Sequence, residues 1–206
     1  MNFRIHGLEA DQFSHLFALP DEALAAHGAV RRIADGPHPC RVSLTDATPG
    51  EEVILVNYEH HAVASPYRMR FAVYVRPGEQ TFDAVGEVPG QLHRRTLAVR
   101  GFDGKGMMTG WELIEGVMLE EAIERQFAVS GAQYLHIHFA APGCYAAKVE
   151  RAGSAAGDRF SHHHSIARLA GSTVTFREPV QCPTPLRFRV PNSTTASPSC
   201  ATIYGN

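Results

Sequence analysis

The segment from Tyr134 to Phe139 carries the strongest chemical signal in the chain, because two histidines alternate there with apolar residues. Side chains of a β-strand point alternately to opposite faces, so this pattern predicts His136 and His138 on one face of a strand. Residues two apart on a strand lie about 6.5–7 Å apart, so the two imidazoles can converge on one metal ion or one anion. The apolar residues predicted on the other face are Leu135, Ile137 and Phe139.

A divalent metal such as zinc needs further ligands besides His136 and His138. The end of another expected strand carries Glu59, His60 and His61. Carboxylate and imidazole groups bind divalent metals, so these residues are the candidates for the further ligands. The predicted metal ligands are therefore His136 and His138 together with Glu59 or His60. Two other interpretations of the histidine pair stay open: a metal-free ligand or acid–base site, and an ordinary polar sheet face.

A thiol is a second candidate for chemistry, since Cys40 follows a proline-rich turn and directly precedes Arg41. A guanidinium beside a thiol lowers the pKa of the thiol, and a nearby histidine would make Cys40 a candidate nucleophile. The alternative is a small core residue at the start of a strand. Cys144 is the weaker candidate because no charged residue adjoins it in the sequence.

Several arginines are predicted to share one face of a strand over residues 68–76. If that face adjoins the face of His136 and His138, it suits a carboxylate or phosphate, because arginine offers paired donors. The alternative is a solvated face balanced by acidic neighbours. The residues predicted on this face include Arg68, Arg70, Tyr74 and Arg76.

Other polar motifs have simpler interpretations. Asp103 lies in a glycine-rich reversal, where an aspartate usually bonds its own backbone. The tract His162–His164 could chelate metal adventitiously. The sequence holds no Walker loop, dinucleotide fingerprint, G-x-S-x-G or H-E-x-x-H motif, which argues against the enzyme classes that these motifs define.

The elements that must position these residues follow from hydrophobic periodicity and turn residues. Strands outnumber helices and mostly follow one another directly, which is typical of an α+β fold. We expect a mostly antiparallel sheet with two to three helices packed on one side. The expected strands cover residues 3–8, 40–44, 52–60, 68–76, 96–101, 110–114 and 133–140, the last followed by a turn and a segment over 144–149, and the expected helices cover residues 9–17, 22–26 and 117–127.

The composition bounds the class of protein. The chain has 206 residues with 19 Lys+Arg and 21 Asp+Glu, a formal net charge of −2, which argues against a nucleic-acid binder. No apolar run approaches the roughly 20 residues that cross a bilayer, and the N-terminal residues do not resemble a secretory signal. We therefore expect a cytoplasmic protein that binds neither nucleic acid nor membrane, with reduced cysteines.

A change of composition divides the chain near residue 153. Residues 1–152 carry a net charge of −5 (14 Lys+Arg, 19 Asp+Glu), whereas residues 153–206 carry +3 (5 Arg, 2 Asp+Glu). Gly, Ser, Thr and Pro make up 22 of the last 54 residues. We predict a single globular domain over 1–152 and a low-complexity, disordered extension over 153–206, because such a segment buries too little apolar surface to offset its ordering entropy.

Six segments of the chain resemble a bacterial family known as domain of unknown function 1203. The resemblance covers essentially residues 1–152, which matches the usual length of the family. It implies no established activity, and it implies that the extension is foreign to the family pattern, either a lineage-specific appendage or a readthrough or frameshifted product. The segments are Pro39–Ala47, Pro49–His60, Ser65–Arg68, Phe102–Met108, Tyr134–His138 and Ala141–Ala152.

The resemblance adds Tyr58, Ser65 and Tyr67 to the candidate ligand-binding residues, because they lie inside these motifs together with Cys40, Arg41, His136 and His138. Two classes of function follow. The first is a small enzyme or metalloprotein, in which His136 and His138 are metal ligands or acid–base groups, Arg41 or Arg70 holds a small anionic substrate, and Cys40 is a candidate nucleophile. The second is a non-catalytic domain that binds a small ligand or a protein.

Overall fold

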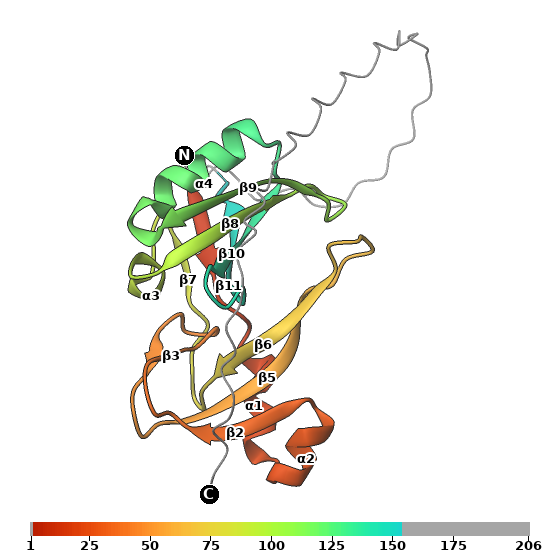
Figure 1. Ribbon diagram of the computed structural model, residues 1–206, viewed down its shortest axis with the longest axis vertical. Coiled ribbons are helices and arrows are strands. Elements are labelled where there is room, and N and C mark those ends of the chain that lie inside the picture. Colours follow the sequence, from red (N-terminus) through yellow and green to blue (C-terminus); the bar gives the residue numbers. More distant parts are fainter. Residues whose placement is uncertain (1, 154–206) are drawn as a thin grey trace, which may run out of the picture. The chain divides into compact units, whose positions relative to one another are not determined.

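The computed structural model describes residues 2–153, which lie in one compact unit, Met1–Asp158. The strands of this unit form sheets of six, three and two strands (Figure 1). All the strand pairings are antiparallel, which confirms the expected α+β class. Within residues 2–153, no helix has the length and apolar character needed to cross a membrane.

The six-stranded sheet holds the predicted histidine strand near its centre, between β11 and β8. Its strand order is β7-β1-β11-β10-β8-β9, so β9 forms one edge and β7 the other. The bounds are β1 Phe3–His6, β7 Asp83–Val85, β8 Thr96–Phe102, β9 Met108–Glu115, β10 Tyr134–Phe139 and β11 Tyr145–Arg151.

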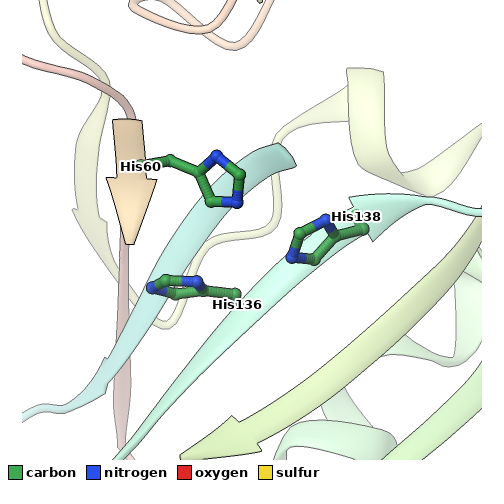
Figure 2. A group of neighbouring side chains, drawn as sticks. All are labelled: His60, His136 and His138. Carbon is green, nitrogen blue, oxygen red and sulfur yellow. The ribbon is translucent and has the colours of Figure 1, made fainter. Parts of the chain in front are cut away.

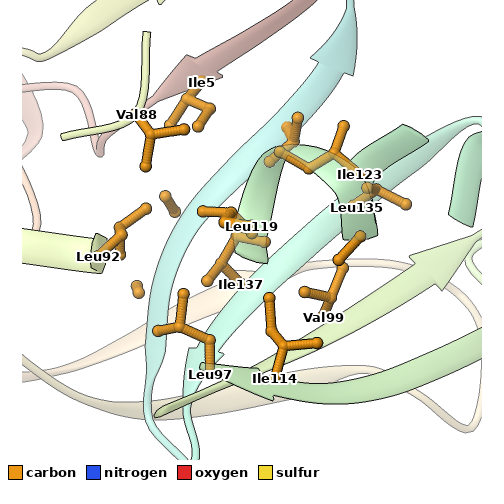
Figure 3. Packing of buried hydrophobic residues seen from close by; sticks show 14 of the residues in the cluster. Ile5, Val88, Leu92, Leu97, Val99, Ile114, Leu119, Ile123, Leu135 and Ile137 are labelled. Carbon is orange, nitrogen blue, oxygen red and sulfur yellow. The ribbon is translucent and has the colours of Figure 1, made fainter. Parts of the chain in front are cut away.

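Helix α4 (Leu119–Val129) covers one face of this sheet, as its apolar periodicity predicts. Its buried residues repeat at three- and four-residue spacing and pack against Leu135 and Ile137 of β10 (Figure 3). Because side chains alternate along β10, this packing turns His136 and His138 to the face away from α4. The buried apolar residues of α4 are Leu119, Ala122, Ile123 and Phe127. The short helix η2 (Gly116–Met118) directly precedes α4 in the sequence, and α3 (Gly90–His93) precedes β8.

The three-stranded sheet carries the other candidate ligands. Its order is β2-β5-β6, with β2 Ala29–Ile33, β5 Glu52–His61 and β6 Met69–Val75. Short helices precede it: α1 (Asp11–Ser14), η1 (His15–Ala18) and α2 (Asp21–Ala26). A second core joins them to the sheet through Phe13, Leu16, Leu24, Ile54 and Val73.

The prediction of a strand over residues 40–44 is wrong. The two-stranded sheet instead pairs β3 (His38–Pro39) with β4 (Asp46–Ala47), and the chain bends back between them. Leu44 adopts a positive φ of 52°, and the amide of Cys40 donates to the carbonyl of Thr45 at 3.0 Å. A left-handed residue interrupts an extended strand, so this apolar segment forms a tight loop whose side chains are buried.

The turn between β5 and β6 contacts the turn between β8 and β9. The hydroxyl of Ser65 donates to the carbonyl of Gly106 at 2.8 Å. A Cβ atom at Gly106 would lie 2.8 Å from Val63, and the φ of Gly106 is +75°, so this close approach requires glycine. The contact ties β5 of the small sheet to the face of the large sheet that carries His136 and His138.

The predicted extension over residues 153–206 and the His162–His164 tract lie outside the described residues, apart from Gly153.

Candidate functional site

Three histidines from two sheets converge at one point. Each ring of His60, His136 and His138 offers a nitrogen, and these atoms all lie within 4.8 Å of one another. Figure 2 shows His60 coming from β5 and the other two rings from β10, all turned toward a shared space. His136 is 2% exposed and His138 is fully buried. We call this group the histidine cluster.

Local strand geometry places these rings. The alternation along β10 turns both of its histidines to the same face, and the register shift beside Ile137 and His138 places the extra residue, Ala146, on the neighbouring strand β11. On β5 the pairing with β6 is also irregular between Tyr58 and His61. Such bulges re-aim side chains, and here His60 points into the cluster. The ring of Tyr145 stacks on His60 with centroids 4.7 Å apart and forms one wall.

Several ring nitrogens of the cluster are buried and have no hydrogen-bond partner in the described part of the chain. They are Nδ1 of His136, Nε2 of His138 and both nitrogens of His60. His138 uses its other nitrogen, Nδ1, in a 3.1 Å contact with the carbonyl of Gly143. Because a carbonyl only accepts, Nδ1 of His138 carries the proton and Nε2 presents a lone pair to the cluster. This is the arrangement in which proteins hold a metal-binding histidine.

The cluster keeps its imidazoles neutral. Burial lowers the pKa of His138 to about 3, with a further contribution from the charge of Arg100. Burial and the neighbouring His61 lower the pKa of His60 to about 4. Burial also holds the pKa of His136 well below its ordinary value. Neutral imidazole is the form that coordinates metal ions.

His61 packs against the cluster from outside, and its ring nitrogens bond other residues. Its Nδ1 lies 2.7 Å from the carbonyl of Tyr67, and its Nε2 lies 2.8 Å from the hydroxyl of Tyr134. Its ring stands edge-on to that of His136 at a centroid distance of 4.8 Å. Both nitrogens of His61 are therefore engaged, and the carbonyl rather than the side chain of Tyr67 takes part.

Sequence reasoning missed Arg100, which lies beside the cluster. On β8, Arg100 is directly opposite His136 of β10, so their side chains share a face. Its charge contributes to lowering the pKa of both His138 and His60. Arg100 alternates with the buried residues Leu97 and Val99, and this pattern in the sequence could have placed it on the face away from α4.

The structure keeps the other acidic and basic candidates apart from the cluster. Glu59 pairs with Arg68, with Oε1 and Nε 2.5 Å apart. Arg70 is exposed and donates to the side-chain oxygen of Asn57 at 3.1 Å, and Arg76 pairs with Glu51 at 2.8 Å. The expected joint surface of arginines and histidines does not form, because these arginines are satisfied within the small sheet and its loops.

Three further candidates have structural contacts of their own. The hydroxyl of Tyr58 donates to Oε1 of Gln12 at 2.7 Å, and Ser65 makes the contact between turns described above. Asp103 accepts from the amides of Lys105 and Met107 at 2.8 and 2.9 Å, as expected of a turn aspartate.

Within residues 2–153, the candidate thiol Cys40 makes no hydrogen bond with Arg41. Cys40 is fully buried, and burial raises the pKa of its thiol to about 12. Arg41, which is 1% exposed, donates from Nε to the carbonyl of Tyr145 at 2.6 Å and from Nη2 to Sγ of Cys144 at 3.1 Å. The guanidinium thus donates to Cys144, 103 residues away in the sequence, and not to Cys40.

We expect the native chain to alkylate at Cys40 about a thousandfold more slowly at pH 8 than the denatured chain does. The reason is that a thiol with a pKa near 12 holds far less thiolate at pH 8 than a free thiol with a pKa near 8.5. Iodoacetamide labelling followed by mass spectrometry of the peptide that contains Cys40 measures both rates. Equal rates would restore Cys40 as a candidate nucleophile.

The cluster can hold a metal ion with a small inward adjustment. Nitrogens at 2.0–2.1 Å from a tetrahedral zinc lie about 3.4 Å apart. In this structure the three histidine nitrogens lie within 4.8 Å of one another. Rotation of the rings by roughly an ångström at their nitrogens closes this difference. Zinc with three protein ligands keeps a position for water or substrate, polarises carbonyl groups and lowers the pKa of water.

Comparisons with known proteins identify the family but no activity. A search of curated proteins and a search of solved structures found no match to the chain. A family model described as protein of unknown function (DUF1203) matches residues 37–151, a span that includes all three histidines of the cluster. The chain belongs to the DUF1203 family.

Proposed function

We propose that His60, His136 and His138 bind one divalent transition-metal ion such as zinc, and that the protein is a small metalloenzyme acting on an anionic substrate. The observation that carries this proposal is the convergence of three imidazoles, two of them buried and that of His60 half-buried, which hold buried ring nitrogens without a hydrogen-bond partner among residues 2–153. An unpartnered buried polar atom costs about 1–3 kcal/mol. One metal ion would engage a nitrogen of each ring at once.

The low pKa values favour ligands over acid–base groups. A general base works best when its pKa lies near the operating pH. Imidazoles with pKa values of about 3 and 4 bind protons weakly at neutral pH, which limits them as proton acceptors. The same neutrality leaves their lone pairs available to a metal ion.

The ligand set favours a catalytic over a purely structural ion. Structural zinc sites usually have four protein ligands, whereas catalytic sites have three and leave one position for water or substrate. Within residues 2–153, the metal-ligating group consists of the three histidines alone. The aromatic residues Tyr145, Phe102 and Tyr134 surround the rings and restrict water around them.

Metal content of the full chain, purified without a tag and measured by mass spectrometry, tests the proposal. Three proteins are compared: the parent, a cluster variant (His136→Gln with His138→Asn), and a tract variant with glutamine at positions 162, 163 and 164. After incubation with zinc and dialysis, we expect about one ion per chain in the parent and the tract variant, and almost none in the cluster variant. Circular dichroism verifies that each protein is folded.

Two results would overturn the proposal. One is a parent that holds no stoichiometric metal after incubation with zinc, cobalt or iron. The other is a metal signal that disappears in the tract variant and persists in the cluster variant, because the ion would then belong to His162–His164.

A further inference from the structure

Arg100 places a cation on the cluster face, and no carboxylate of the described residues pairs with it. In residues 2–153, its one hydrogen-bond contact runs from Nη1 to Sδ of Met69 on β6, at 3.7 Å. Burial alone lowers the pKa of Arg100, with no contribution from a neighbouring acidic group. By contrast, Lys148, on the other side of His136, pairs with Glu150 at 2.5 Å.

A guanidinium that is half-buried and unpaired is a strong anion receptor. It presents five N–H donors in a planar fork that matches two oxygens of a carboxylate or phosphate. Partial removal from water strengthens such a pair, since the effective dielectric constant is lower than in bulk solvent. Among residues 2–153, the thioether of Met69 is the only hydrogen-bond acceptor that contacts Arg100.

On the same face, exposure rises from the cluster toward the edge strand β9. Directly opposite residues share a face, so the row that contains His138 continues through Ala98 of β8 to Leu113 of β9. Exposure rises along this row, from the fully buried His138 through the half-buried Ala98 to Leu113 at 61%. The parallel row runs from His136 through Arg100 to Trp111, which is 73% exposed. Both rows therefore lead from the surface at β9 to the cluster.

We propose that Arg100 binds the oxyanion of a small substrate, a carboxylate or a phosphate, whose reacting end lies at the metal ion of the histidine cluster. This inference rests on the proposed function and assigns its substrate class. The arginine that binds the anion is then Arg100, and not Arg41 or Arg70 as expected from the sequence. Arg41 is enclosed against Tyr145 and Cys144, and Arg70 is hydrogen-bonded to Asn57 on the small sheet. Arg100 is a specificity residue at the substrate end opposite the metal.

Cobalt(II) gives a readout that does not depend on knowing the reaction. The full chain with glutamine at positions 162, 163 and 164 is loaded with cobalt, and acetate or inorganic phosphate is titrated while the visible absorption of the metal is recorded. Four proteins are compared: the parent, Arg100→Met, Arg100→Lys and the matched control Arg32→Met, in which an exposed arginine of β2 is replaced. Methionine keeps an unbranched apolar stem, and lysine keeps the charge without the fork.

We expect all four proteins to bind cobalt equally. The dissociation constant of the effective anion should rise at least tenfold in Arg100→Met, rise less in Arg100→Lys and stay unchanged in Arg32→Met. A response to acetate alone assigns a carboxylate substrate, and a response to phosphate alone assigns a phosphate.

The two proposals fail in distinguishable ways. If the parent binds no cobalt, the metal centre fails and the role of Arg100 fails with it. If the parent binds cobalt, but neither anion perturbs its spectrum or Arg100→Met binds the anion as tightly as the parent, the metal centre stands and Arg100 is not the anion-binding residue.

Discussion

Replacing His138 with asparagine should weaken zinc binding by well over 100-fold while the chain stays folded. The amide nitrogen of asparagine is as many bonds from Cα as Nδ1 of histidine, so it can still donate to the carbonyl of Gly143, now 3.1 Å from Nδ1. The variant loses only Nε2, which faces the cluster without a partner. Loss of an outer partner of a ligand costs 10–100-fold in affinity, and loss of the ligand itself costs more. Competition with a chromophoric chelator measures the affinity.

His61→Gln is the matched control, because His61 is the next residue after a proposed ligand and lies against His136. Both ring nitrogens of His61 already have partners, and glutamine can retain the contact with the hydroxyl of Tyr134. We expect its zinc affinity to stay within tenfold of the parent. Equal losses in the two variants would indicate a general loosening of the site, and parental affinity in His138→Asn would remove His138 from the ligand set.

The parts of the site that a single strand or helix determines could be predicted from the sequence. Apolar periodicity located α4, and alternation along residues 134–139 put His136 and His138 on one face. The choice among Glu59, His60 and His61 could not be made, because it depends on an irregularity in β5 between Tyr58 and His61. A bulge changes which neighbours face inward, and nothing in the alternation of these polar residues indicates it.

The features of the site that the sequence did not predict depend on contacts between segments far apart in the chain. Arg100 joins the cluster only through the register of β8 with β10, which pairs it with a residue 36 positions later. Arg41 donates to Cys144 rather than to the adjacent Cys40, because the tight loop after β3 buries both residues and brings Arg41 against the start of β11. Neighbours in the sequence therefore suggested a thiol–guanidinium pair at Cys40, whereas the fold forms one at Cys144.

Metal-free protein should lose stability steadily as the pH falls from 7.5 to 5. A histidine whose pKa is lowered by folding binds protons more readily in the unfolded chain. Its contribution to stability is complete above the unfolded pKa of about 6.5 and is lost as the pH falls toward the folded pKa. For His138, with a folded pKa of about 3, the loss by pH 5 is about 2 kcal/mol. His60 and His136 act in the same direction.

Urea unfolding in the presence of a chelator, at several pH values between 5 and 7.5, measures this loss in the parent and in His138→Asn. Asparagine does not titrate, so the free energy of unfolding of the variant should depend on pH less steeply, by about 2 kcal/mol over this range. Parallel curves would mean that His138 is protonated as readily in the folded chain as in the unfolded chain. A ring that accepts protons so easily would have to be hydrated rather than enclosed, and the neutral, partnerless nitrogens on which the metal site depends would then be absent.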